Sequence, residues 1–154
     1  MKEDIEMRKM VVLIIMIAAA AVAISAQHQT ATIPAKISKE DLSGKIFERE
    51  DMLEIKHESG NVTLDVTTLL SSDKKFASGM YRSGKSYFEA TDPYGVDEFM
   101  YFLEGSVKLT STDGTVQTIN AGEAVTIPKE WTGIWDTEGY TKIWVIYSED
   151  GSGL

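Results

Sequence analysis

The sequence of 154 residues contains no cysteine and only two histidines, His28 and His57. Without cysteine, the chain has no disulfide, no thiol nucleophile, no thiolate-held zinc and no iron–sulfur cluster. Two histidines far apart in the chain do not predict a site built from several imidazoles. The glycine patterns of phosphate-binding loops and the nucleophile elbow of hydrolases are also missing. These absences exclude many familiar kinds of catalytic site.

Basic residues are fewer than acidic ones, 15 against 24, so the formal net charge is −9. The acidic and basic residues among the first nine positions cancel, so the rest of the chain carries the whole net charge. Such a surface repels phosphate backbones and anionic membranes. Nucleic acid is therefore not an expected partner.

An apolar run covers residues 10–26 and is preceded by Arg8 and Lys9. Its length suits the hydrophobic region of a signal peptide better than a spanning helix, which needs about 20 residues. We therefore expect residues 1–26 to be a signal peptide and the protein to be exported, either periplasmic or secreted. The alternative is an uncleaved anchor, in which case the membrane is a partner. Residues 27–44 are polar and are expected to form a linker or arm, within which Ser38 and Asp41 fit a capping box.

From residue 45 onward, short β-branched and aromatic runs alternate with turn signals, and no long helical period is present. This pattern predicts an all-β domain over residues 45–150, a sandwich or a small barrel. The GSGL tail is expected to fray. The predicted strands after the first turn include residues 62–70, 76–82, 85–90 and 141–147.

The most informative stretch runs from Gly95 to Trp135, and it contains DEFMYFLEG and AGEAVTIPKEWTGIW. Six residues separate Glu98 from Gly105, which is expected to break the first strand, and five separate Gly122 from Pro128. The Asp113-Gly114 pair between these segments is expected to supply the two positive φ angles of a hairpin turn. These spacings resemble the two motifs of the cupin superfamily, and the sequence of the two segments is most similar to the ureidoglycine aminohydrolase-type cupin domain family. The resemblance implies a double-stranded β-helix, a jelly-roll barrel, with its site in the barrel mouth.

Metal-binding cupins carry two histidines just before the glutamate of the first motif and a third after the proline of the second. Glu98 matches that glutamate, but the upstream histidine positions fall near Asp92 and Tyr94, and the third falls on Gly133. The usual three-histidine site is therefore not expected, and no metal or cofactor is predicted. The family's named hydrolase also uses histidines, so the resemblance leaves open whether this chain is an enzyme.

Period-2 alternation places Glu98, Met100 and Phe102 on the inward face of one strand. Glu98 either contacts a ligand or accepts hydrogen bonds from Tyr and Trp donors and stabilises the fold. Tryptophan rings near a barrel mouth suit planar or sugar-like ligands, and a nearby arginine suits a carboxylate, although core packing and a solvated surface are the alternatives. Core packing is expected for Trp144. The candidate ligand-binding residues are Glu98, Tyr94, Trp135, Trp131, Asp92, Arg82 and Met100.

Three functions follow from these observations. The first is an exported cupin-domain protein that binds a small polar molecule, a sugar or an organic acid, without a metal. The second is a metal-assisted enzyme of the hydrolase or isomerase class, in which Glu98, Asp92 and Tyr94 supply oxygen ligands. The third is a structural barrel that dimerises. Because cupins often pair through strand edges, a homodimer is expected in any case.

Overall fold

The computed structural model describes residues 32–154, and nearly all of them belong to one compact unit, Ala35–Leu154. The predicted signal peptide or anchor, residues 1–26, lies outside the described residues. Within the described part, no helix has the length and apolar character needed to cross a membrane. The elements are α2 Lys39–Leu42, η1 Lys45–Glu48, β1 Leu53–Lys56, β2 Val62–Leu70, β3 Phe76–Ser83, β4 Ser86–Ala90, β5 Asp97–Ser111, β6 Val116–Asn120, β7 Ala124–Ile127 and β8 Gly133–Tyr147.

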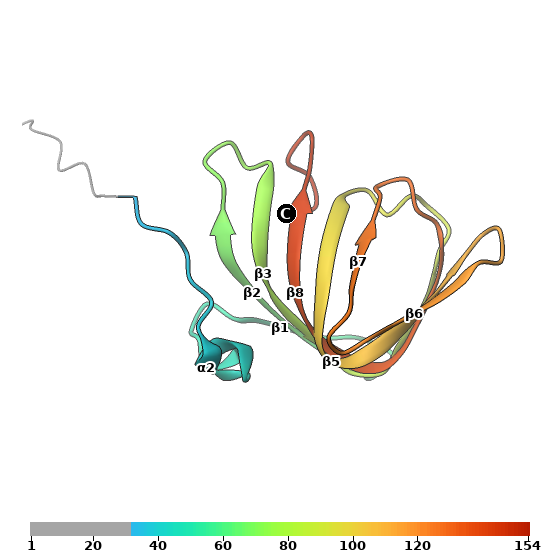
Figure 1. Cartoon of the computed structure of the whole chain (residues 1–154), viewed down its shortest axis with the longest axis horizontal. Coiled ribbons are helices and arrows are strands. Elements are labelled where there is room, and N and C mark those ends of the chain that lie inside the picture. The colour runs from blue at the N-terminus through green and yellow to red at the C-terminus, as the bar shows by residue number, and fades with distance from the viewer. Residues whose placement is uncertain (1–31) are drawn as a thin grey trace, which may run out of the picture. The chain divides into compact units, whose positions relative to one another are not determined.

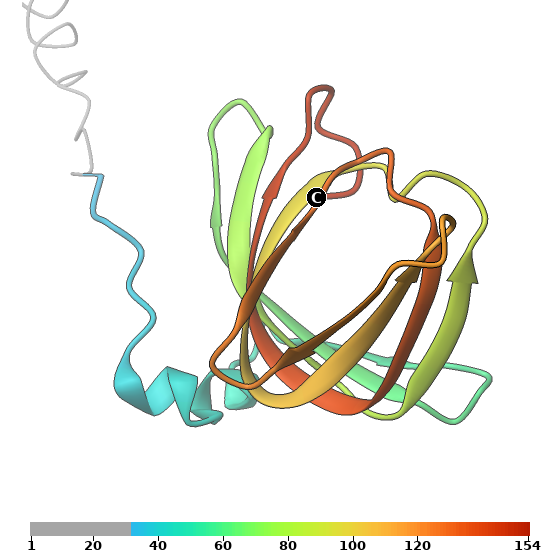
Figure 2. The same ribbon diagram turned by 45° about the vertical axis from the view of Figure 1, so that its right-hand side comes forward.

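The strands form one antiparallel sheet that curls around an interior (Figures 1 and 2). Its order is β1-β2-β3-β8-β5-β6, with β4 added to β8 and β7 added to β5. The two long strands β5 and β8 pair along most of their length. Their other edges are shared, because β8 pairs with β3 near its end and with β4 near its start, while β5 pairs with β7 and then β6. The molecule is the jelly-roll barrel that the sequence predicts.

Both long strands bend where two glycines meet. Gly105 of β5 has φ 70° and lies in the stretch of β5 where the pairing with β8 shifts register. A Cβ atom on Gly105 would lie 2.0 Å from the carbonyl oxygen of Gly139 in β8, so only glycine permits this approach. The sequence prediction that the strand breaks at Gly105 is therefore wrong, because β5 bulges and continues.

One hydrophobic core occupies part of the barrel interior. The alternation of β5 buries Met100 and Phe102, both with no exposed surface, and leaves Phe99 and Tyr101 exposed on the outer face. The inward direction predicted for Glu98, Met100 and Phe102 is confirmed. The remaining buried members of this core are Val107, Leu109, Ile119, Ile127, Trp135 and Tyr140.

A second, smaller core lies on the outer face of the sheet, where the segment with α2 and η1 covers it. Ile46 and Phe47 of η1 are buried against Val66 of β2 and Met80 of β3. The predicted capping box is confirmed, because the Ser38 hydroxyl accepts from the Asp41 N–H and the Asp41 carboxylate accepts from the Ser38 N–H. Ile37 and Leu42 of the predicted arm pack against this core, so part of the arm is fixed to the barrel.

Candidate functional site

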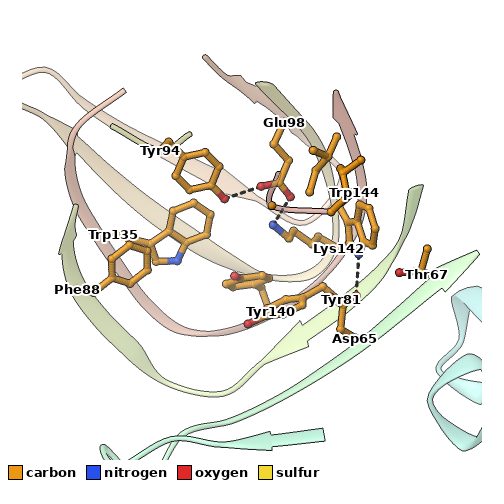
Figure 3. Close-up of a pocket in the computed structure, with 13 residues that line it drawn as sticks. Asp65, Thr67, Tyr81, Phe88, Tyr94, Glu98, Trp135, Tyr140, Lys142 and Trp144 are labelled. Atoms are coloured by element: carbon orange, nitrogen blue, oxygen red, sulfur yellow. Dashed lines mark hydrogen bonds and ion pairs between the residues drawn. The ribbon is translucent and has the colours of Figure 1, made fainter. Parts of the chain in front are cut away.

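A cavity of about 280 Å³ lies at the mouth of the barrel (Figure 3). This volume lies just below the range of ligand pockets, which measure roughly 300–1,000 Å³. Side chains from five strands and from the last two residues of the chain surround it. The lining residues are Asp65, Thr67, Tyr81, Phe88, Tyr94, Glu98, Trp135, Tyr140, Lys142, Trp144, Ile146, Gly153 and Leu154.

A buried ion pair sits on the inner side of this cavity. The Lys142 ammonium lies 2.6 Å from Oε1 of Glu98, and the two side chains are only 6% and 4% exposed. Glu98 comes from β5 and Lys142 from the neighbouring β8, and both point into the barrel because of their strands' alternation. Removing two charges from water is costly, and their close contact offsets much of that cost.

Tyr94 and Met100 complete the polar contacts of the pair. The Tyr94 hydroxyl donates to Oε2 of Glu98 at 2.5 Å, and Nζ of Lys142 donates to the Met100 sulfur at 3.0 Å. Burial, with the Glu98 carboxylate as the next cause, raises the pKa of Tyr94 far above its ordinary value. Tyr94 is therefore a neutral donor at any physiological pH, and both carboxylate oxygens of Glu98 are engaged.

Aromatic rings surround the ammonium group. Nζ of Lys142 lies 5.4 Å from the ring centroid of Tyr81, 5.6 Å from that of Trp135 and 5.9 Å from that of Tyr140. At these distances the ring faces attract a cation. Phe88 of β4 stacks on Trp135 with centroids 5.8 Å apart and extends the aromatic wall. The wall gives the cavity flat apolar surfaces beside one fixed charge.

A second carboxyl group, that of Asp65 in β2, lines the same cavity. Its Oδ1 accepts from the Trp144 indole N–H at 3.0 Å. Burial raises the pKa of Asp65, and the hydrogen bond from Trp144 and the charge of Lys142 oppose this only in part. Trp144 is buried in the interior, as predicted, and it also forms part of the cavity wall.

The structure brings together three of the predicted site residues, because Glu98, Tyr94 and Trp135 all line the cavity. Met100 lies directly behind them and contacts Lys142. Which of these residues binds a ligand stays a prediction. Their positions around one cavity agree with the inward direction assigned to them from the sequence.

The structure places the other three predicted residues elsewhere, which corrects those assignments. Arg82 follows the inward Tyr81, so alternation turns it to the outer face, where its guanidinium lies 4.6 Å from the Phe47 ring centroid and bonds Thr141. Asp92 is exposed in the loop before β5. Trp131 is half-buried and donates its indole N–H to Ser111, outside the cavity lining.

Sequence reasoning missed the most important partner, Lys142. The signal was present in TKIWVIY, because Lys142 and Trp144 share one face of an alternating strand. An inward Trp144 requires an inward Lys142, and a buried lysine requires an acid such as Glu98. Tyr140 and Asp65 were missed as well, because neither lies at a position of the two motifs.

The residues present do not fit the metal site that the fold often carries. Both oxygens of Glu98 are occupied by Lys142 and Tyr94, Asp92 faces solvent, and Gly133 has no side chain. Among residues 32–154, no three His, Cys, Asp or Glu side chains gather in a way that suits a metal ion. The oxygen-ligand set proposed from the sequence therefore does not assemble.

The C-terminal tail contributes to the cavity, so the expectation that it frays is wrong. Asp150 accepts hydrogen bonds from the backbone and the hydroxyl of Ser152 and from the hydroxyl of Ser148. These bonds, that from the Ser152 N–H first, lower the pKa of Asp150 to about 2. The turn they fix brings Gly153 and Leu154 to the edge of the cavity. Figure 2 shows the C-terminus beside the opening of the barrel.

A closed jelly roll with its cavity at the mouth defines a cupin-type barrel, and comparison with known proteins supports this class. Residues 70–142 match the family model of the EutQ-like cupin domain. This match, which covers just under half of the chain, supports the cupin superfamily. The narrower resemblance to ureidoglycine aminohydrolase-type domains stays a prediction.

Solved structures share the fold at low sequence identity. The chain resembles the EutQ protein of Clostridium difficile with a TM-score of 0.52 and 20% identity, covering 65% of this chain and 78% of that one. For a Rhizobium leguminosarum bv. viciae 3841 protein of unknown function, the TM-score is 0.51 and the identity 24%, covering 77% and 100%. For ectoine synthase from P. lautus, the values are 0.52 and 15%, covering 67% and 72%. No curated protein matches the sequence. At these identities the likeness shows the fold alone.

Proposed function

We propose that this cupin barrel binds a small polar molecule, a sugar or an organic acid, in the cavity at its mouth. The observation that carries the proposal is the buried Lys142–Glu98 pair, which faces an aromatic-walled cavity. Ligand pockets characteristically combine apolar and aromatic walls with a few fixed polar groups. The cavity has both.

A purely structural barrel explains these features less well. A buried ion pair is often no more stabilising than apolar residues of the same volume. The interior of this barrel contains the pair and also keeps a cavity of about 280 Å³ beside it. A scaffold without a ligand has no use for either feature, so the arrangement favours binding.

Tryptophan fluorescence of the full chain tests the proposal. A panel of sugars and of short carboxylic acids is titrated, and a saturable change in emission is expected because Trp135 and Trp144 line the cavity. Trp135→Phe should lose most of the change. Trp131→Phe is the matched control and should keep it, because Trp131 lies outside the cavity lining. If no compound shifts the emission or the NMR signals of cavity residues, the proposal is wrong.

The enzymatic alternative has its own test. A metal-assisted hydrolase or isomerase requires stoichiometric metal that disappears in Glu98→Gln. Metal analysis of protein purified without chelator is expected to find none, because both oxygens of Glu98 already accept hydrogen bonds, from Lys142 and from Tyr94. If stoichiometric metal is found and depends on Glu98, the proposal of a binding module is wrong and a metalloenzyme takes its place.

The partner and the location of the protein follow as further parts of the proposal. Phe76, Phe99 and Tyr147 are exposed on adjacent strands of the outer sheet face, which favours a homodimer through this face. Light scattering tests this, with Phe99→Lys expected to shift the protein to a monomer. Export is proposed from the apolar run at residues 10–26, and N-terminal sequencing of the mature protein tests it.

A further inference from the structure

The polar groups of the cavity differ in what they still offer to a ligand. Glu98 accepts at both oxygens, while Lys142 uses two of its three ammonium protons, on Glu98 and Met100. The Tyr140 hydroxyl and the Trp135 indole N–H form no hydrogen bond with another residue of the described part of the chain. Lys142 therefore keeps one ammonium proton for a ligand, beside the unused donors of Tyr140 and Trp135.

A ligand that matches these donors is rich in acceptors. The ammonium of Lys142 is a fixed positive charge, and three ring faces shield it from water. Interactions with a charge are stronger in such a water-poor site. A carboxylate supplies both the charge and several acceptor positions, whereas a sugar hydroxyl supplies neither the charge nor the same density of acceptors.

The resident carboxylate of Glu98 sets the condition for such binding. Two carboxylates that share one ammonium repel each other, and in a buried site one of them takes up a proton. Neutral Glu98 can still accept from Tyr94 at Oε2, while its O–H on the Oε1 side donates to the incoming carboxylate. The proton comes from solvent, so charge is conserved in the site.

We infer that the cavity selects small carboxylates over neutral polyols, and that each carboxylate binds Lys142 together with one proton taken up by Glu98. The inference rests on the proposed function and narrows its ligand class.

The other titratable groups that face the pair come from the neighbouring elements. They are Asp65 of β2, Tyr81 of β3, Tyr94 before β5 and Tyr140 of β8. Burial raises the pKa of each tyrosine, so these phenols stay neutral near pH 7. Asp65 competes with Glu98 for the proton, and it needs its own control.

The experiment compares carboxylates of two to six carbons with their primary amides, for example lactate with lactamide, and with glycerol. Binding to the full chain is measured by calorimetry and tryptophan fluorescence between pH 6 and pH 8. One proton taken up per ligand predicts that carboxylate affinity falls about tenfold for each pH unit. Amides and glycerol should bind weakly and without this slope.

Two isosteric variants, Glu98→Gln and Asp65→Asn, identify which carboxyl group takes up the proton. In Glu98→Gln the slope should vanish, and lactate affinity at pH 8 should rise about a hundredfold over wild type, which is the tenfold slope taken over two pH units. Asp65→Asn should keep the slope, and Lys142→Met should lose carboxylate binding. If Glu98→Gln does not fold, wild-type calorimetry in buffers of different ionisation enthalpy still counts the protons.

The outcomes separate the inference from the function on which it rests. Amides or glycerol that bind as tightly as carboxylates, or a slope that vanishes in Asp65→Asn instead, would overturn the inference and leave the binding function intact. A chain that binds neither class would overturn both.

Discussion

Replacing Lys142 by methionine is the sharpest test of the site's energetics. Methionine keeps most of the side-chain length but removes the charge, and it leaves Glu98 buried with Tyr94 as its one remaining partner. Breaking a buried pair in this way costs about 3–5 kcal/mol of unfolding free energy. Because both side chains are almost fully buried, at 6% and 4% exposure, we expect a value inside this range.

The chain contains a matched control with the same geometry in water. Lys85 and Glu138 are also 2.6 Å apart, but their side chains are 73% and 81% exposed. Solvent screens such a pair, so Lys85→Met should leave stability unchanged within the error of measurement. Comparing the two variants isolates burial, because the distance between the charged atoms is identical.

Urea unfolding followed by far-ultraviolet circular dichroism measures both variants. The double variant Lys142→Met/Glu98→Gln should recover most of the loss, because no charge is then left buried. Equal stabilities for Lys142→Met and Lys85→Met, or simple additivity in the double variant, would refute the reasoning.

Three further predictions concern the barrel itself. Gly105→Ala should abolish folding or lower the melting temperature sharply, since its Cβ would meet the Gly139 carbonyl at 2.0 Å; a soluble variant with wild-type thermal unfolding would contradict this. Phe102→Ala should cost about 3–5 kcal/mol in urea unfolding, because the ring is fully buried in the barrel core. Burial raises the pKa of Tyr94 and Tyr140, so the folded state holds their protons more tightly than the unfolded state. The contribution of these two tyrosines to stability is therefore fully present below about pH 10, the pKa of tyrosine in the unfolded chain, and it is lost as the pH rises above that value. A spectrophotometric titration should show two tyrosines that ionise only when the protein unfolds at alkaline pH.

Local signals in the sequence were sufficient for most of the fold. The predicted hairpin forms at Asp113-Gly114, but the predicted pair of positive φ angles does not, because Gly114 has φ 86° and Asp113 does not have a positive φ. The Ser38 capping box also forms, because it depends on residues three apart. The continuation of β5 through Gly105 was not predictable in this way, since it depends on Gly139, which is distant in sequence.

The site was harder to predict because its contacts are long-range. The partners Glu98 and Lys142 lie 44 positions apart, and only the pairing of β5 with β8 brings them together. Arg82 shows the opposite error, because its chemistry suited a carboxylate but one step of strand alternation turns it away from the cavity. Residue type alone indicates candidate site residues, but the strand register decides which of them face the cavity.

The position of the cavity on β8 has a consequence for how the protein opens. This strand supplies Trp135, Tyr140 and Lys142 to the cavity wall, and it is hydrogen-bonded along both edges. Sites built on loops loosen by local fluctuations, whereas amides in a doubly paired central strand exchange their hydrogens mainly when the whole domain unfolds. The binding groups and the fold therefore belong to one cooperative unit. If the proposed ligand binds, it should slow hydrogen exchange throughout the barrel and not only around itself.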